Sequence, residues 1–262
     1  MKCMKILAVG DVCGSIGCDY VRKVLPALKR EKNIDFVIIN GENSADGNGM
    51  TPFSANSLFD AGADVLTGGN HSFRRKEVFD YLEEKDCVLR PHNFGDANYG
   101  KGYCFIDCGS FGIAVINLSG KIYLEKNALT CPFAVADELI AKAMTDGARV
   151  IVVDFHAEAT SEKRALGLYL DGKVSAFFGT HTHVQTADEQ ILQNGTGYIT
   201  DLGMTGPIDS VLGVKKEIII NRLKDNDMSK FELADGECSL SGCIFEIDIK
   251  TGKTVNIERI LI

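Results

Sequence analysis

Short apolar runs that alternate with stretches of helical spacing are the feature that most constrains the fold of this chain. The runs at 5–9, 36–39 and 150–153 are rich in Val, Ile and Leu, as buried strands are. The stretch 19–32 instead carries apolar residues three and four positions apart, which is typical of a helix that packs on a sheet. Strands that alternate with helices predict an α/β fold.

The same two patterns continue to the end of the chain. We expect further strands at 64–67 and 176–178 and further helices at 51–61, 77–85, 132–145 and 161–170. Residues 103–108 and 113–118 flank a glycine-containing turn, which predicts a hairpin, and 197–200, 243–249 and 254–260 are strand-like. The second half therefore adds antiparallel strands. Since no repeat or low-complexity linker divides the 262 residues, we expect one domain over 1–262.

The charge of the chain bears on its ligands. Its 36 acidic and 28 basic residues give a formal net charge of −8, and the basic residues form no dense cluster. A broad contact with a nucleic-acid backbone needs a basic stripe, so long nucleic acid is not expected as a partner. Small anionic substrates stay compatible with this charge, because a bound metal ion dominates its local field.

The cysteines and the apolar runs bear on location. The nine cysteines are odd in number and include no C-x-x-C pair, which argues against a disulfide framework or a thiolate metal site. The first residues show no signal-peptide pattern, and no apolar stretch approaches the ~18–20 residues that cross a bilayer. We expect a reduced, cytoplasmic protein with no membrane contact.

Possible metal ligands stand directly after five of the predicted strands, and glycine precedes them after four of these strands. They are Asp11, Glu42, Asn43, Asn70, His156, His181 and His183, and His71 follows Asn70. In open α/β sheets, ligands bind at the carboxyl ends of the strands, so these side chains are expected to converge.

Each of these signals also has a plain structural reading. Gly10-Asp11 and Gly41-Glu42-Asn43 on their own are more often turns, and a single histidine such as His156 is more often structural than a ligand. The run 179–183, Gly-Thr-His-Thr-His, is more specific, since two imidazoles two residues apart can reach one metal cluster. Turn chemistry explains the whole converging set poorly.

Ligand type indicates the metal and the reaction. Carboxylate, amide and imidazole ligands without thiolate favour two ions of iron or manganese, with zinc as a further candidate. Seven ligands are too many for one ion, but they suit a pair ~3.5–4 Å apart, which clamps the attacking and leaving oxygens of a phosphoryl displacement. The expected nucleophile is a hydroxide that bridges the two ions and attacks phosphorus.

The order of these motifs resembles the calcineurin-like metallophosphoesterases, and most closely their YmdB-like branch, over nearly the whole chain. The stretches that carry the resemblance are Gly-Asp-Val-Cys-Gly-Ser at 10–15, Ile-Asn-Gly-Glu-Asn at 39–43, Gly-Asn-His at 69–71, and the segments 154–162, 179–188 and 201–207. The resemblance implies a four-layer αββα sandwich of two mixed β-sheets, with the dimetal site at their edge.

The resemblance also implies a role for each candidate residue. One metal would be held by Asp11, Glu42, Asn43 and His183, and a second, bridged by Glu42, would be held by Asn70, His156 and His181. His71 would be the catalytic histidine, which protonates the leaving oxygen or stabilises charge on the phosphorane.

The implied activity is a phosphodiesterase acting on small phosphodiesters such as cyclic nucleotides, first 2′,3′-cyclic and then 3′,5′-cyclic ones, in a homo-oligomer. Two alternatives stay open: a phosphomonoesterase at the same site, and a metal-stabilised regulator that binds a partner protein or RNA.

The chain departs from the wider family at two positions. Cys13 stands where the usual Asp-x-His has its histidine, so that Asn43 is expected to fill the vacant coordination position; Cys13 is either a thiolate ligand or, as we favour, a small buried thiol. Ser72 stands where an acidic residue commonly follows the catalytic histidine, which leaves open which group orients His71. The spacing of Gly10, Gly14 and Gly17 does not match a dinucleotide-binding fingerprint.

Overall fold

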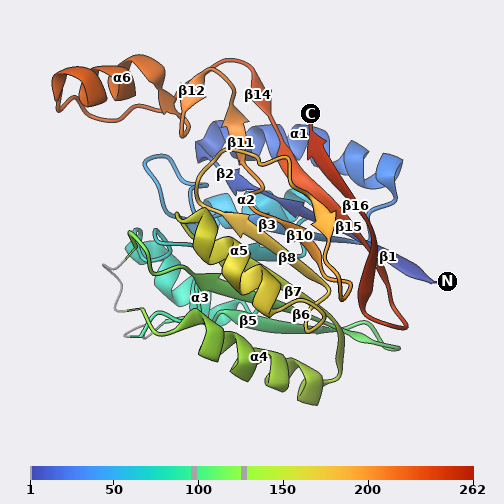
Figure 1. Ribbon diagram of the computed structural model, residues 1–262. Helices are drawn as coiled ribbons and strands as arrows, with labels where there is room; N and C mark the ends of the chain where they lie inside the picture. Colours follow the sequence, from blue (N-terminus) through green and yellow to red (C-terminus); the bar gives the residue numbers. More distant parts are fainter. Residues whose placement is uncertain (1, 96–98, 125–128) are drawn as a thin grey trace.

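Two mixed β-sheets form the centre of the computed structural model, which describes residues 2–95, 99–124 and 129–262 (Figure 1). The first sheet has the order β16-β15-β1-β3-β4. Its strands are β1 Cys3–Val9, β3 Phe36–Asn40, β4 Val65–Thr67, β15 Ser241–Asp248 and β16 Lys253–Leu261. The strands β1, β3 and β4 are parallel, whereas β15 and β16 are antiparallel additions from the end of the chain.

The second sheet has the order β5-β6-β7-β8-β10-β9. Its strands are β5 Tyr103–Asp107, β6 Gly112–Ser119, β7 Ala148–His156, β8 Ala176–Thr180, β9 Gln190–Ile191 and β10 Gly197–Ile199. The predicted hairpin is confirmed, since β5 and β6 pair antiparallel from Tyr103–Ile116 to Asp107–Gly112. The strands β6, β7, β8 and β10 run parallel.

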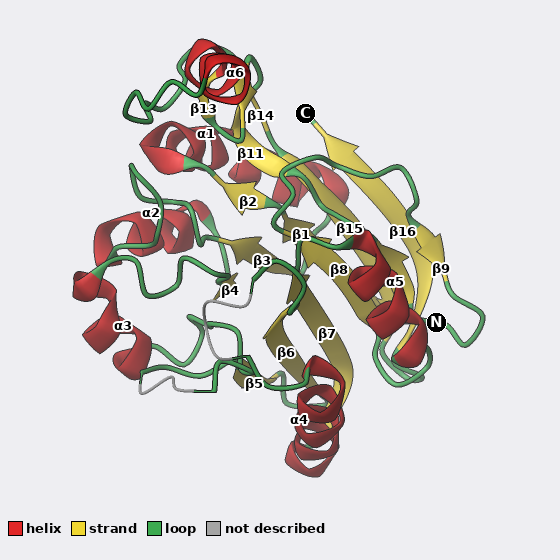
Figure 2. Cartoon of the chain, turned by 60° about the vertical axis from the view of Figure 1, so that its left-hand side comes forward, coloured by secondary structure: helices red, strands yellow, loops and turns green. Residues whose placement is uncertain are grey.

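Three separate hydrophobic cores define four layers. The alternation of side chains along β1 explains two of them, because Ile6 and Ala8 face the second sheet while Leu7 and Val9 face the helices. The third core joins the far face of the second sheet to its helices. In Figure 2, α2 and α3 lie to the left of the strands, α4 lies below them, and α5 lies to the right of β7 and β8. The expected αββα sandwich of two mixed sheets is confirmed.

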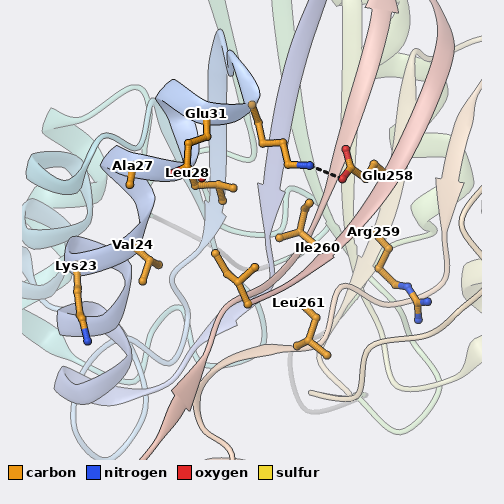
Figure 3. Close-up of a pocket in the computed structure, with 11 residues that line it drawn as sticks. Lys23, Val24, Ala27, Leu28, Glu31, Glu258, Arg259, Ile260 and Leu261 are labelled. Atoms are coloured by element: carbon orange, nitrogen blue, oxygen red, sulfur yellow. Dashed lines mark hydrogen bonds and ion pairs between the residues drawn. The ribbon is translucent and has the colours of Figure 1, made fainter.

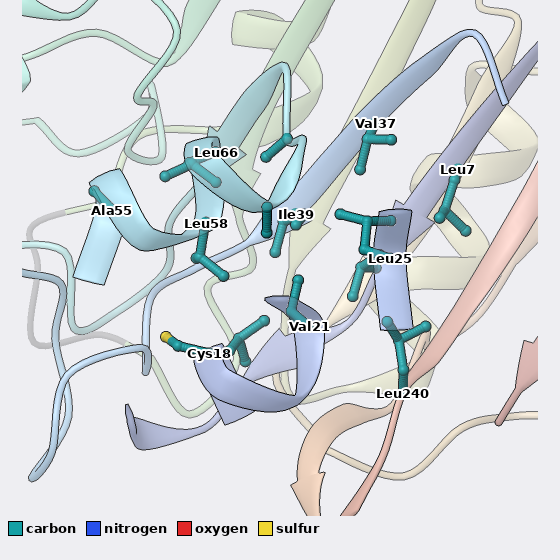
Figure 4. Packing of buried hydrophobic residues seen from close by; sticks show 14 of the residues in the cluster. Leu7, Cys18, Val21, Leu25, Val37, Ile39, Ala55, Leu58, Leu66 and Leu240 are labelled. Carbon is teal, nitrogen blue, oxygen red and sulfur yellow. The ribbon is translucent and has the colours of Figure 1, made fainter. Parts of the chain in front are cut away.

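The helices that cover the first sheet are α1 Gly14–Lys32, α2 Pro52–Ala61 and α3 Phe79–Glu84, the last preceded by a 3₁₀ turn at Lys76–Val78. Val21 and Leu25 of α1 and Leu58 of α2 pack on Val37 and Ile39 of β3 (Figure 4). The other sheet is covered by α4 Pro132–Asp146 and α5 Thr160–Tyr169.

Helix α1 begins five residues before the stretch predicted from apolar spacing. Its first turn packs so closely on a neighbouring strand that a Cβ at Gly17 would lie 2.7 Å from the carbonyl oxygen of Thr205. The glycine makes this approach possible but carries no apolar side chain, so the periodic pattern is silent there.

A smaller unit lies outside the two main sheets. It contains β11 Met204–Pro207, which pairs with β2 Asp11–Val12 and β14 Cys238–Ser239, then the pair β12 Ser210–Val211 and β13 Val214–Lys215, and α6 Lys216–Asp225. Figure 1 shows α6 projecting from the body, and the helix buries none of its residues. The sequence patterns did not predict α6. None of the described helices combines the length and apolarity that crossing a bilayer requires.

Candidate metal centre

The carboxyl ends of strands from both sheets meet at one edge, and all eight predicted site residues lie there. Asp11 begins β2, Glu42 and Asn43 follow β3, Asn70 and His71 follow β4, His156 ends β7, and His181 and His183 follow β8. The groove of about 490 Å³ in Figure 3 lies elsewhere, between α1 and β16, where Lys32 and Glu258 form an ion pair of 2.6 Å.

His156 is the centre of one group of ligand atoms. Its Nε2 lies 2.9 Å from Oδ1 of Asn70, 3.1 Å from Nδ1 of His181 and 3.4 Å from Oε1 of Glu42. One ligand atom from each of Glu42, His156 and His181 lies within 4.8 Å of the other two. This spacing suits a single shared ion.

His183 is the centre of the other group. Its Nε2 lies 3.3 Å from Nδ2 of Asn43 and 3.7 Å from Oδ1 of Asp11. Oε1 of Glu42 accepts a hydrogen bond of 2.9 Å from Asn43, so the Glu42 carboxylate touches both groups. The geometry thus places Glu42 between two sets of three residues.

Asp11 supplies the observation that tests the fit of a cation. Its carboxylate is fully buried; Oδ2 accepts a hydrogen bond from the backbone N–H of His181, but Oδ1 has no hydrogen-bond partner among the described residues. A buried carboxylate oxygen without a partner is costly, and a metal ion would remove that cost. Burial, with the nearby Glu42 charge adding to it and His156 opposing it, raises the pKa of Asp11 to about 7.

The pKa values of the three candidate histidine ligands differ sharply. Burial lowers the pKa of His181 to about 3 and that of His183 to about 4, with the charge of His156 adding to both effects. Burial also disfavours the charged form of His156, but Glu42 and Asp11 outweigh it and raise its pKa to about 9. For Glu42, burial is likewise outweighed, by His156 and His71, so its pKa falls well below the usual value. An ionised carboxylate and neutral imidazoles are the forms that bind metals.

A hydroxyl and a carboxylate fix the ring of His156. The Thr180 hydroxyl donates to Oδ1 of Asp154 at 2.8 Å and lies 2.9 Å from Nδ1 of His156. Because its one hydrogen points to Asp154, the hydroxyl accepts from Nδ1–H, which leaves Nε2 for the ligand cluster. Asp154, fully buried in β7, also accepts from Thr67 at 2.5 Å and Asn40 at 3.0 Å, both of the first sheet.

The other two rings have different partners. Nε2 of His181 lies 3.1 Å from Oε2 of Glu158, and Nδ1 of His183 lies 3.6 Å from the sulfur of Cys13. Cys13 is buried, and burial, together with the charges of Asp11 and Glu42, raises its pKa well above the usual range. Its burial agrees with the small buried thiol that we favoured, and its role toward a metal ion stays a prediction.

His71 is oriented by residues of the cluster itself. Its Nδ1 lies 3.0 Å from Oδ1 of Asn43 and 3.2 Å from Oε1 of Glu42, and its backbone N–H donates to Oε2 of Glu42 at 3.0 Å. Ser72 does not take the place of the missing acidic residue. Its hydroxyl donates to the carbonyl of Gly69 at 2.8 Å and so shapes the turn that presents His71.

Sequence patterns missed the residues that support the ligands. Asp154 had a usable signal, because it lies two residues before His156 on the same face of an apolar strand. Thr180, inside the quoted Gly-Thr-His-Thr-His run, had one as well. Glu158 had none, because its contact with His181 depends on how two loops meet.

Comparison with known proteins gives matches over the full length. A family model described as YmdB-like protein matches residues 7–260. A 2′,3′-cyclic-nucleotide 2′-phosphodiesterase of Bacillus subtilis (strain 168) is 50% identical over 259 residues, which cover 99% of this chain and 97% of that protein. A crystal structure described as a novel phosphatase from Mycoplasma pneumoniae has a TM-score of 0.94 at 36% identity and covers 100% of this chain and 94% of the other.

A more distant structure shares the fold alone. A putative 5′-nucleotidase from Staphylococcus aureus has a TM-score of 0.61 at 15% identity, and the match covers 100% of this chain and 54% of that protein. The nearer relatives support the expectation that this chain is an enzyme with phosphodiesterase activity. Since the family model spans nearly all of the sequence, the chain belongs to the YmdB-like protein family.

Proposed function

We propose that this chain is a dimetal phosphodiesterase that hydrolyses cyclic nucleotides, with 2′,3′-cyclic nucleotides as its first substrates. The observation that carries the proposal is the buried Glu42 carboxylate, which lies between two sets of potential ligands from both sheets. The substrate class is supported by the name of the Bacillus subtilis relative. The proposed catalytic domain extends over residues 1–262.

The ligand sets divide the work of holding two ions. Asp11, Asn43 and His183 with Glu42 would hold one ion, and Asn70, His156 and His181 with Glu42 the other. When bound, the ions would supply a hydroxide near neutral pH and charge stabilisation for a phosphoryl displacement. The mixed oxygen and nitrogen ligands favour iron or manganese, with zinc as a further candidate.

His71 is the proposed proton donor. Its side chain is 30% exposed, so that a substrate can reach it, whereas the Glu42 side chain is 1% exposed. Asn43 and Glu42 hold Nδ1, and the ring therefore presents Nε2 as the nitrogen that can protonate a leaving oxygen.

The first experiment replaces His71 with alanine. Turnover of bis(p-nitrophenyl) phosphate and of 2′,3′-cyclic nucleotides should fall by about 10²–10⁴-fold, the usual contribution of a positioned acid or base, while elemental analysis finds the metal content unchanged. His92→Ala is the matched control, because that histidine contacts Gly102 and should leave turnover intact. Unchanged turnover in His71→Ala would contradict the proposed role.

The choice of substrate separates the alternatives. p-Nitrophenyl phosphate and its bis-ester at matched metal loading distinguish a monoesterase from a diesterase, and a panel of 2′,3′- and 3′,5′-cyclic nucleotides ranks the cyclic substrates. A strong preference for the monoester would reverse our ranking. Metal-loaded protein that hydrolyses no phosphoester at all would instead favour a regulator that binds a partner.

Two further expectations belong to this proposal. The homo-oligomeric state stays a prediction, which light scattering of the purified protein tests. The cytoplasmic location also stays a prediction, and cell fractionation tests it.

A further inference from the structure

Lys163 and Asp201 form an ion pair inside the molecule. The Nζ–Oδ2 distance is 2.6 Å, and the two side chains are 0% and 1% exposed. Burying both charges costs desolvation energy that their attraction often fails to recover, so such a pair is weak evidence for stability. Its contacts indicate another role.

The Asp201 carboxylate joins three segments. Besides Lys163 of α5, Oδ2 accepts from the backbone N–H of Thr182 at 3.2 Å and from its hydroxyl at 2.7 Å. Oδ1 accepts from the backbone N–H of Gly203 at 2.8 Å. The carbonyl of Gly203 in turn accepts from the backbone N–H of Asp11 at 3.1 Å.

Thr182 stands between the two histidines of the Gly-Thr-His-Thr-His run. His181 has φ = 100° and His183 has φ = 63°, so both occupy a backbone region that residues other than glycine rarely adopt. Each such residue costs about 1–3 kcal/mol and persists only where its surroundings hold it. The hydrogen bonds from Thr182 to Asp201 restrain the segment between these two residues.

Lys163 reaches Asp201 across β8. A Cβ at Gly179 would lie 2.8 Å from Cδ and 2.9 Å from Cε of Lys163, which shows how closely the lysine stem passes over that strand. The ammonium group neutralises a carboxylate that would otherwise be a lone buried charge beside the ligand cluster.

We propose that the Lys163–Asp201 pair positions the metal ligands: it holds Thr182, and thereby His181 and His183, and through Gly203 it holds Asp11. Lys163 and Asp201 are positioning residues, since they act through Thr182 and Gly203. This inference rests on the metal centre of the proposed function.

The test is Mn²⁺ binding to the full chain, measured by calorimetry and by electron paramagnetic resonance. Lys163→Met keeps the length of the side chain but removes its charge, and it should weaken Mn²⁺ binding about 10–100-fold, as loss of a group that supports metal ligands does. Lys173→Met is the matched control, because it removes an exposed lysine from a 3.0 Å pair with Asp137 and should bind Mn²⁺ as the wild type does.

A second variant covers the case in which Lys163→Met does not fold. Thr182→Val removes only the 2.7 Å hydroxyl contact to Asp201, and it should weaken Mn²⁺ binding several-fold while hydrogen exchange at the 181–183 amides becomes faster. If Lys163→Met folds and binds Mn²⁺ with wild-type affinity, the pair is only structural and the inference is overturned, even if the melting temperature is lower. If Lys163→Met does not fold, the same result for Thr182→Val overturns the inference.

The two proposals fail in different ways. A wild-type protein that binds Mn²⁺ but hydrolyses no phosphoester contradicts the proposed function and leaves the positioning inference standing. A wild-type protein that binds no Mn²⁺ overturns the inference together with the metal centre.

Discussion

At the scale of single residues, each of the three candidate histidine ligands has one ring nitrogen held by a different kind of group. His156 is held by the Thr180 hydroxyl, His181 by a carboxylate and His183 by the Cys13 thiol. Such partners select the tautomer and orient the ring before a metal ion arrives. The differences allow each ring to be weakened separately.

Thr180→Val should lower metal affinity without much change in shape. The hydroxyl that accepts from His156 and donates to Asp154 is lost, so the His156 ring is no longer fixed, and we expect Mn²⁺ binding to weaken about 10–100-fold by calorimetry. Thr254→Val is the control, since Thr254 is also buried and donates to a backbone carbonyl, at 2.7 Å, outside the site. Equal affinity in the two variants would show that Thr180 does not orient the ligand.

Cys13→Ala should affect one ion more than the other. The sulfur contacts the ring of His183 but no residue of the group around His156, so only one of two Mn²⁺ binding steps should weaken, by several-fold. Cys243→Ala, which removes a fully buried thiol from the core between the sheets, should leave both steps unchanged. Weakening of both steps, or of neither, would contradict the assignment of Cys13 to one ion.

At the scale of secondary-structure elements, the site depends on turns that bring backbone close to ligand side chains. After β4, a Cβ at Gly69 would overlap the Glu42 carboxylate and the His156 ring. Only glycine therefore allows this turn to pass between the two residues and place Asn70 beside His156.

Gly69→Ala should accordingly disrupt the metal site far more than it disrupts the fold. We expect loss of stoichiometric Mn²⁺ binding, with a far-UV circular dichroism spectrum close to that of the wild type. Gly109→Ala is the control: its Cβ would meet nothing within 4 Å, and its φ of 79° costs about 1 kcal/mol of backbone strain without touching the site. Full metal binding by Gly69→Ala would show that the turn can shift.

The elements also show which parts of the structure a sequence can reveal. Short apolar runs predicted the strands that carry the ligands. The strands β1, β3, β7 and β8 are buried on both faces, and therefore their sequences are continuously apolar. The apolar pattern did not predict α6, which has no fully buried residue, nor the parallel pairing of Asp11 with Met204 in β2 and β11. These features depend on contacts between distant segments, which no local pattern encodes.

At the scale of the whole molecule, the ligands come from both sheets, and a polar bridge joins the sheets beside them. Asp154 of the second sheet accepts hydrogen bonds from Asn40 and Thr67 of the first, above a core that is otherwise apolar. Ions that bind across this edge would therefore stabilise the packing of the two halves, and removing them with a chelator should lower the melting temperature.

The stabilisation by metal should also depend on pH. Asp11 and His156 have pKa values raised to about 7 and about 9, so the protons they hold stabilise the metal-free fold at low pH. For His156 this contribution is complete below about 6.5, the unfolded value, and is lost as pH rises through about 9; for Asp11 it is lost as pH rises through about 7. The lowered pKa of Glu42 acts oppositely, since its contribution is present above about 4.5 and is lost only as pH falls below that value.

Between pH 6.5 and 8.5 the metal-free protein should therefore become less stable, while Mn²⁺ should bind more tightly because fewer protons have to be displaced. The stabilisation by Mn²⁺ should grow across this window by up to about 1.4 kcal/mol per pH unit for each proton released, so the rise in melting temperature on adding Mn²⁺ should also grow. Scanning calorimetry at fixed Mn²⁺ measures the shift in melting temperature. Titration calorimetry in buffers of different ionisation enthalpy measures the number of protons that are released on binding. A metal-induced shift in melting temperature that is the same at every pH would mean that the ions do not displace protons from Asp11 and His156, and that they bind elsewhere in the molecule.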